Sequence, residues 1–304
     1  MDEFNQKNQA CTQRPTDSPC WVDSVPESMS EVRASRFLVV LLLLFLILTG
    51  PKAGAAAITF NTALPVSQSE VILREQLVVR DLGVVTQQSL NTVLGYGVTP
   101  KLAVFGVLPL TRVEFDNDAG RDFGLGDASV FARYEVLRRD AAGATLRLAP
   151  FAGVRLPSAT DDLLGDDSTD ALLGVVLTSA TTKRIIDTQI AWELNGSNGG
   201  NRAGHRGSFD LSLQYRAWPK QPTEHTRGFV YAVIESGVIY QDQSSSTDGR
   251  LEDGGWQWFL SPGIQYVRQR FIADLAVRLP VATDLDQDAL RADYSVLASI
   301  RLNF

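Results

Sequence analysis

Cysteine is almost missing from this chain of 304 residues. Cys11 and Cys20 are the only two, and both fall in a polar, proline-containing leader without hydrophobic periodicity. A disulfide framework and a thiolate metal centre are therefore excluded for everything that follows the leader.

Clusters of basic residues are missing as well. The formal net charge is −7, and no group of Lys and Arg stands out to neutralise phosphates, which argues against nucleic acid as a partner. A phosphate-binding glycine loop is missing too, because "GLGDAS" begins a predicted strand where a nucleotide site needs a helix. We predict no cofactor.

Catalytic and metal-binding residues are scarce. The two histidines, His205 and His225, are predicted at opposite rims, so a hydrolase would depend on His205 near Ser197 or Ser208, and we expect an ordinary loop histidine instead. The acidic stretch "TDDLLGDDSTD" supplies hard oxygen ligands but lacks the ordered spacing of a calcium loop. We predict no metal, with a solvated loop formed by the weak candidates Asp161, Asp162, Asp166 and Asp167.

Long apolar runs are represented by one segment, "RFLVVLLLLFLILTGPKAGAAA". Its uninterrupted part, 37–48, is short against the roughly 20 residues of a transmembrane helix. Arginines before it and small residues after it are typical of a signal peptide, and a retained anchor is the alternative. We predict a leader over 1–28, upstream of the true start if translation begins at Met29, and a signal peptide over 29–57. The mature chain would begin at Ala56 or Ile58, with a short periplasmic segment over 58–68.

After residue 58 no apolar stripe of helical period and length occurs, and strict alternation takes its place. In "ADYSVLASIRLNF" the residues from Tyr294 to Phe304 alternate between an apolar and a polar face. The same pattern recurs along the chain and predicts an all-β fold. The predicted strands are 69–80, 89–98, 102–115, 126–138, 144–157, 170–179, 184–195, 207–218, 228–241, 255–267, 270–281 and 290–303.

Short turns alternate with longer polar loops between these strands. Together with the even strand number, the export signal and aromatic residues near strand ends, this predicts a closed antiparallel transmembrane β-barrel of about 12 strands over 69–304. Short turns would face the periplasm and longer loops the exterior. A soluble β-sandwich is the alternative, because alternation does not say which face is inside. Pro109, Pro150 and Pro262 fall within or near strand patterns, so we expect bulges or earlier strand ends there.

Several phrases carry a family resemblance: "TFNTALPV", "VLGYGVTPKLAVFGVLPL", "GLGDASVFARYEVL", "LRLAPFAGVRLP", "DLSLQYRAWP" and the C-terminal "LNF". Over residues 59–304 the chain resembles the outer-membrane barrel family named after the MetA pathway of phenol degradation. The resemblance implies transport across the outer membrane, with aromatic compounds among the family's substrates and no shared catalytic residues. The C-terminus also resembles the signal read by the barrel-assembly machinery, carried by Tyr294, Ile300, Leu302 and Phe304.

Charged residues on the polar faces are the best functional candidates, since in a membrane barrel these faces line the lumen. They could fill the lumen as a salt-bridged network or line an open passage. The predicted lumen-lining residues are Arg112, Glu114, Arg133, Glu135, Arg147, Arg155, Asp187, Glu193, Asp210, Arg216, Asp274, Arg278, Asp293 and Arg301.

The sequence therefore predicts a non-enzymatic outer-membrane barrel of a Gram-negative bacterium that passes small solutes, aromatic or polar, by diffusion. The alternative is a non-conducting barrel that binds envelope partners or lipopolysaccharide through its loops, and a hydrolase is the least favoured reading. The expected partners are outer-membrane lipid and lipopolysaccharide, the barrel-assembly machinery and a small-molecule solute.

Overall fold

The computed structural model describes residues 55–83, 85–115, 120–247, 249–286 and 291–304. The predicted leader over 1–28 and the signal peptide up to residue 54 lie outside these ranges. Within the ranges, no helix is long and apolar enough to cross a membrane.

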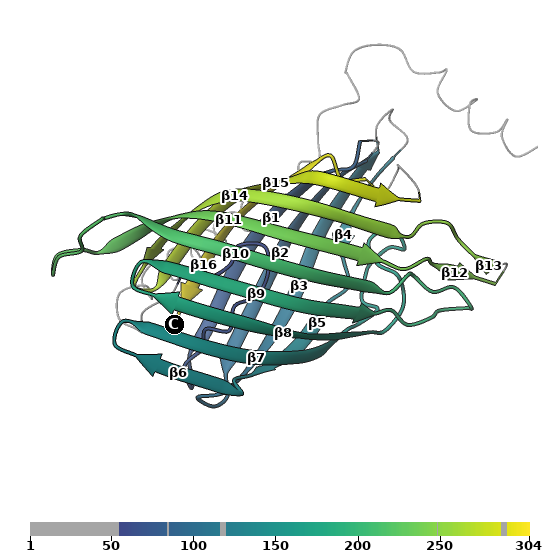
Figure 1. Ribbon diagram of the computed structural model, residues 1–304. Coiled ribbons are helices and arrows are strands. Elements are labelled where there is room, and N and C mark those ends of the chain that lie inside the picture. The colour runs from purple at the N-terminus through teal and green to yellow at the C-terminus, as the bar shows by residue number, and fades with distance from the viewer. Residues whose placement is uncertain (1–54, 84, 116–119, 248, 287–290) are drawn as a thin grey trace, which may run out of the picture. The chain divides into compact units, whose positions relative to one another are not determined.

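The described chain consists of strands joined by turns and loops (Figure 1). The strands are β1 (Val71–Asp81), β2 (Val85–Gly97), β3 (Leu102–Phe115), β4 (Arg121–Leu125), β5 (Ser129–Tyr134), β6 (Leu137–Ala141), β7 (Ala144–Arg155), β8 (Asp170–Thr181), β9 (Arg184–Leu194), β10 (Arg206–Trp218), β11 (Gly228–Gln241), β12 (Ser245–Ser246), β13 (Gly249–Arg250), β14 (Gly255–Arg268), β15 (Phe271–Leu285) and β16 (Tyr294–Asn303).

The large sheet closes on itself. All pairings are antiparallel, and all but one join strands that are close in the chain; the ring is completed where β1 pairs with β16, from Ile72 opposite Asn303 to Asp81 opposite Tyr294. Because β4, β5 and β6 occupy one position between β3 and β7, the 14-stranded sheet makes a barrel of twelve strands. Closure leaves no free edge in this sheet, and the predicted closed antiparallel barrel is confirmed.

The two ends of the barrel differ in their connections. Turns join β2 to β3, β6 to β7, β8 to β9, β10 to β11 and β14 to β15 at the end that we call the short-turn end. Most connections at the opposite, long-loop end are longer, including the loop over 242–254 that carries the small β12–β13 hairpin (Figure 1). The turn between β1 and β2 is the short exception at this end.

The outer surface of the barrel is apolar between two belts of aromatic residues. Exposed leucine, isoleucine and valine side chains cover the middle of the strands, such as Leu211, Ile264 and Ile300. The belt at the short-turn end comprises Tyr96, Tyr134, Tyr215, Trp218 and Tyr266, and the belt at the long-loop end comprises Trp192, Tyr240, Trp256, Trp258 and Tyr294. Apolar side chains facing outward between aromatic belts are the arrangement of a barrel solvated by lipid, and the opposite of a soluble sandwich.

Proline positions explain the two interruptions of the strand made by β4, β5 and β6. The gap between β4 and β5 lies opposite Pro109, whose carbonyl accepts the N–H of Gly126 at 2.9 Å. The gap between β5 and β6 lies next to Pro150 of β7. Proline has no N–H for the ladder, so the partner strand bulges where proline faces it.

Candidate functional site in the barrel lumen

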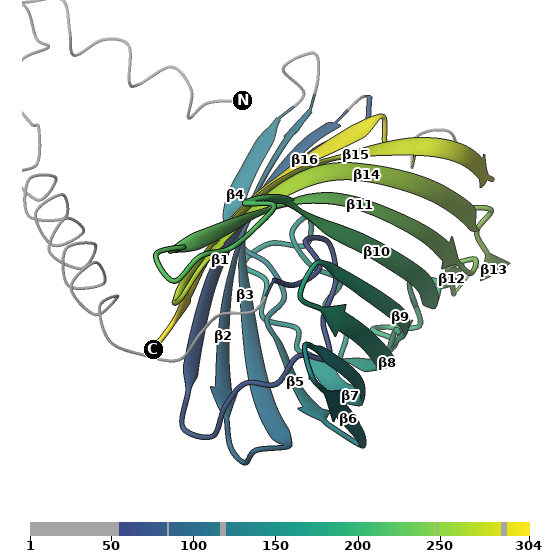
Figure 2. The ribbon, with the colours of Figure 1, turned by 60° about the vertical axis from the view of Figure 1, so that its left-hand side comes forward.

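Residues 55–66, which we call the luminal segment, run inside the barrel instead of leaving its short-turn end (Figure 2). Its first part is held by β11 and β14. The side-chain amide of Gln265 accepts the N–H of Ala56 at 3.1 Å and donates to the Ala56 carbonyl at 2.9 Å. The two carboxylate oxygens of Glu235 accept the N–H groups of Ile58 at 2.8 Å and Thr59 at 3.0 Å.

The second part of the luminal segment is held by β5, β8 and β9. The Thr62 hydroxyl donates to Asp187 at 2.9 Å and lies 3.1 Å from the hydroxyl of Thr178, which also bonds Asp187. The Arg133 guanidinium donates to the carbonyls of Thr62 and Leu64. Side chains on the inward faces of the strands thus satisfy backbone N–H and C=O groups of the luminal segment. In a β-strand, such groups would pair with the backbone of a neighbouring strand.

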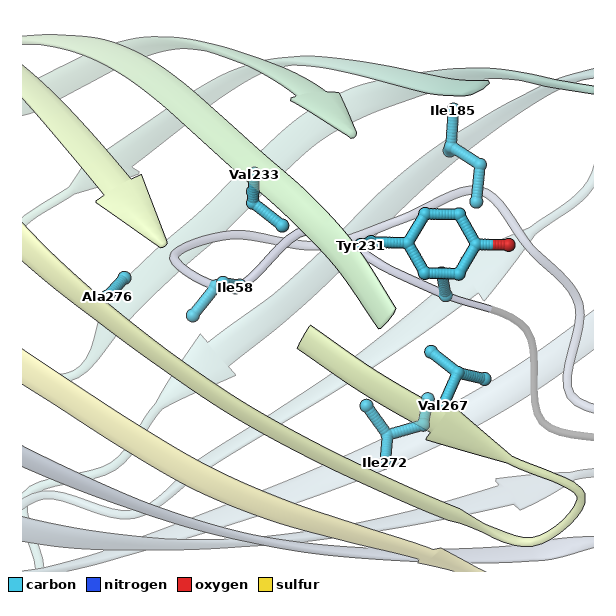
Figure 3. Packing of buried hydrophobic residues seen from close by; sticks show 8 residues of the cluster. Ile58, Ile185, Tyr231, Val233, Val267, Ile272 and Ala276 are labelled. Atoms are coloured by element: carbon cyan, nitrogen blue, oxygen red, sulfur yellow. The ribbon is translucent and has the colours of Figure 1, made fainter. Parts of the chain in front are cut away.

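Apolar side chains inside the barrel also pack on the segment. Ile58 is fully buried, with 0% of its surface exposed, in a cluster with inward residues of β9, β11, β14 and β15 (Figure 3). Ala63 packs with Ala149 and Val176, and Val66 belongs to a third cluster with Phe105. Each of the three interior clusters therefore contains part of the segment, and the inside of the barrel has a small hydrophobic core.

The connection from the segment to β1 depends on a glycine. A Cβ at Gly97 would lie 1.9 Å from the carbonyl oxygen of Ser67. With no side chain there, the backbones approach closely enough for Ser69 to donate to the Gly97 carbonyl at 2.8 Å and for Gly97 to donate to Glu70 at 3.0 Å. The sequence predicts 58–68 as a short periplasmic segment, and nothing in its pattern indicates these contacts.

Most of the predicted lumen-lining residues do point inward. Asp187 and Asp274 are buried at the centre of hydrogen-bond networks, and Arg301 donates to Asn303 at 3.1 Å. The predicted residues that lie on inward faces are Arg133, Glu135, Arg147, Arg155, Asp187, Glu193, Asp210, Arg216, Asp274, Arg278 and Arg301.

The predicted luminal positions of Arg112 and Glu114 were wrong. In β3 the buried residues Thr111 and Val113 face inward, so Arg112 and Glu114 face outward, where they pair with each other at 2.8 Å. The open end of the β2–β3 strand pair, where Val85 lies opposite Phe115, extends at the long-loop end with polar residues on its outer face. Polarity therefore does not mark the lumen at that level. Asp293 is a further correction, because it lies before β16 and is exposed at the rim.

Ion pairs neutralise part of the lumen. Arg155 pairs with Asp170 at 2.6 Å, with Asp166 at 3.1 Å and with Glu193. Asp166 belongs to the loop between β7 and β8, where burial raises its pKa although Arg155 acts in the opposite direction. At the short-turn end, Arg147 pairs with Glu135, and both are buried.

Open space lies mainly between the luminal segment and the long-loop end. Three cavities there have volumes of about 360, 320 and 240 Å³. Thr59, Phe60 and Asn61 line the second of these, and the cavities beside the segment measure only about 80 and 10 Å³. The segment thus forms the floor of a chamber on the side of the long-loop end.

The structure gives the surroundings of the candidate metal residues and of the hydrolase candidates His205 and Ser208. No group of three or more His, Cys, Asp or Glu side chains is placed to hold a metal ion among those residues. His205 uses Nδ1 to accept the N–H of Asn195 at 3.0 Å, while Ser208 donates to Asp210 at 2.9 Å. The hydroxyl of Ser208 is therefore engaged with a carboxylate and not with the imidazole.

Sequence reasoning missed several residues that hold the segment. Glu235, Gln265 and Thr178 were not singled out, although each stands at an inward position of its predicted strand. Arg80 was missed in the same way, on the face of β1 that also carries Arg74. Extending the period-two pattern to every polar residue of each strand would have found them, although not what they bind.

The comparisons with known proteins give a likeness of fold. No family model matches the sequence, and no curated protein sequence matches it. The structure is similar to an outer membrane channel from Pseudomonas putida F1, with a TM-score of 0.62 and 14% identity over 83% of this chain and 100% of that one. The β domain of the Bordetella autotransporter BrkA gives a TM-score of 0.43 and 13% identity over 77% of this chain and 98% of that one. At 14% identity, the likeness to the outer membrane channel shows a shared barrel fold alone.

Proposed function

We propose that this protein is an outer-membrane channel for small solutes, in which the luminal segment closes the passage and must move for a solute to cross. The long-loop end would face the exterior and the short-turn end the periplasm. The observation that carries the proposal is the chamber above the segment, because a solute entering from the loops meets a floor held by side-chain hydrogen bonds. The fold shared with an outer membrane channel supports it.

The solute class is proposed from the family resemblance and the lining. The phrases similar to the phenol-degradation family suggest compounds the size of a single aromatic ring. Phe60, Phe131 and Phe151 line the 320 Å³ cavity together with charged groups. Pockets that bind small molecules commonly combine apolar walls with a few polar groups, which fits this lining.

A non-conducting barrel is the second candidate, and the burial of the segment favours it. Ile58 and Asp187 are both fully buried at the segment, as in the interior of a soluble protein. A plug held this firmly could be permanent, leaving the loops to bind envelope partners.

A disulfide that locks the segment tests the channel proposal. The hydroxyl oxygens of Thr62 and Thr178 are 3.1 Å apart, so cysteines at these positions are close enough to bridge. In a background carrying Cys11→Ser and Cys20→Ser, the Thr62→Cys/Thr178→Cys protein should conduct in planar bilayers when reduced. It should lose conductance when oxidised, with Thr178→Cys alone as the control that is insensitive to oxidant.

Two results would argue against the proposal. Equal conductance of the oxidised and reduced protein would show that ions cross the barrel without movement of the luminal segment. A barrel that is folded and never conducts, even when the segment is loosened by substitution of Glu235, would favour the non-conducting alternative.

A further inference from the structure

Three arginines line one cavity in the upper lumen. Arg80 from β1, Arg206 from β10 and Arg278 from β15 all border the 240 Å³ cavity at the long-loop end. In the described ranges, none of the three forms an ion pair, whereas Arg155 in the same chamber pairs with three carboxylates. The cavity thus brings together three guanidinium groups, none of which has a carboxylate at ion-pair distance among the described residues.

Two side chains that border this cavity carry buried hydrogen-bond donors that lack an acceptor among the described residues. The Nε atom of Arg278 and the Nε2 atom of Gln257 are buried, and neither has a hydrogen-bond partner within the described part of the chain. Arg80 does have one, because its guanidinium donates to Gln87 at 3.2 Å. A buried donor without a partner is costly, so a small turn of either side chain toward the cavity, where an acceptor could be met, would be favourable.

The remaining walls are largely apolar. Leu82, Ile239, Phe259 and Leu285 line the cavity, and the Arg278 guanidinium lies 5.3 Å from the centre of the Phe259 ring. The carboxylate that borders the cavity, Asp253, accepts the N–H of Ser244 at 2.7 Å. An acceptor that also carries an apolar body fits these walls better than a bare inorganic ion.

We propose that this cavity binds a small organic anion, namely a monocarboxylate with a compact apolar body. The carboxylate would meet Arg278 and Gln257, with Arg80 and Arg206 supplying further positive charge, since guanidinium groups bind carboxylates with short charge-assisted hydrogen bonds. The volume lies at the small end for ligand pockets and limits the body to about one ring. As a statement about the transported solute, the inference rests on the proposed function, but binding itself does not require conduction.

Equilibrium binding of matched probes tests this site. 4-Fluorobenzoate and the neutral isostere 4-fluorobenzamide are titrated by ¹⁹F NMR into the barrel in a detergent with an uncharged headgroup. The acid should bind and the amide should not. Arg278→Gln should weaken binding of the acid at least tenfold, and the Arg80→Gln/Arg206→Gln/Arg278→Gln protein should abolish it.

Controls separate the site from general charge and from misfolding. Arg216→Gln removes an inward arginine at the short-turn end, which lies over the ring of Phe229, and should leave binding unchanged. Arg278→Lys should keep more affinity than Arg278→Gln, because it retains the charge. Heat-modifiable electrophoresis shows that each variant is a folded barrel.

The outcomes are distinct from those for the channel itself. Equal binding of acid and amide, unchanged binding by folded Arg278→Gln, or binding of inorganic phosphate without fluorobenzoate would each overturn the site. Binding of the acid by a barrel that never conducts would support the site and contradict the proposed function. Conduction without selective binding of the acid would support the proposed function and contradict the site.

Discussion

Glu235 offers the sharpest perturbation of the luminal segment. Its carboxylate is 2% exposed and accepts the N–H groups of Ile58 and Thr59 at 2.8 and 3.0 Å. Hydrogen bonds to a charged group contribute about 1.5–3 kcal/mol each, and removing the acceptor leaves two buried donors unsatisfied. Glu235→Ala should therefore destabilise the closed segment by about 3–6 kcal/mol, and Glu235→Gln, which retains one acceptor oxygen, by about half of that.

Single-channel recording converts these energies into open probability. A change of about 1.4 kcal/mol is a tenfold change in an equilibrium constant, so Glu235→Ala should raise the ratio of open to closed channel by about 10² to 10⁴, up to saturation. Glu235→Gln should fall between Glu235→Ala and the native protein. Ile234→Ala, a neighbouring change on the outer face of β11, is the control without effect on gating. Identical open probabilities in all four folded proteins would refute the reasoning.

The position of the predicted signal-peptide cut would affect the contact between Ile58 and Glu235. A cut between Ala57 and Ile58, one of the two predicted sites, would turn the Ile58 nitrogen that contacts Glu235 into an ammonium group. Charge-assisted pairing would then strengthen the contact. A mass spectrum of the exported protein identifies the first residue, and a chain that retains residues 1–28 would contradict the predicted signal peptide.

Further substitutions test the outer surface, the connecting turn and the charge balance of the chamber. Ile264→Asp, in the apolar band, should destabilise the membrane-inserted barrel, by less than the about 2–4 kcal/mol that a basic residue costs at the bilayer midplane. Arg112→Asp should assemble normally in the same heat-modifiability assay, and equal defects would contradict the outward, water-exposed placement of Arg112. Gly97→Ala should lower the unfolding temperature because its Cβ would collide with the Ser67 carbonyl, and an unchanged temperature would show that the turn adapts. Arg155→Gln leaves three carboxylates without their counter-charge and should shift ion selectivity toward cations in reversal-potential measurements, while an unchanged selectivity would place the ion path elsewhere.

The barrel could be predicted from the sequence because its determinants are local. Alternation in β16 and β10 fixes which residues share a face, and turn lengths fix which strands are neighbours. The predicted start of β2 at residue 89 was late, since that strand begins at Val85. After Val85 its first residues, Thr86, Gln87 and Gln88, are polar on both faces, so the periodic signal fades where the outer face leaves the apolar band.

The luminal segment could not be predicted in the same way. Ile58 and Glu235 are separated by 177 residues, and Ala56 and Gln265 by 209. "AITFNTALPV" has neither helical nor strand periodicity, because the groups that satisfy its backbone come from side chains of distant strands. Alternation showed that Asp187 faces the lumen, but only the folded chain shows that Thr62 is its partner.

The luminal segment also bears on how the barrel is assembled. Val71 and Phe304 exchange backbone hydrogen bonds of 3.2 and 2.8 Å, so the seam of the ring joins its first strand to its last, only a few residues beyond the segment. The segment contacts inward side chains from strands all around the ring, and these become enclosed once the seam forms. We therefore expect the luminal segment to be in place before β1 pairs with β16, because its contacts are enclosed once the seam has formed.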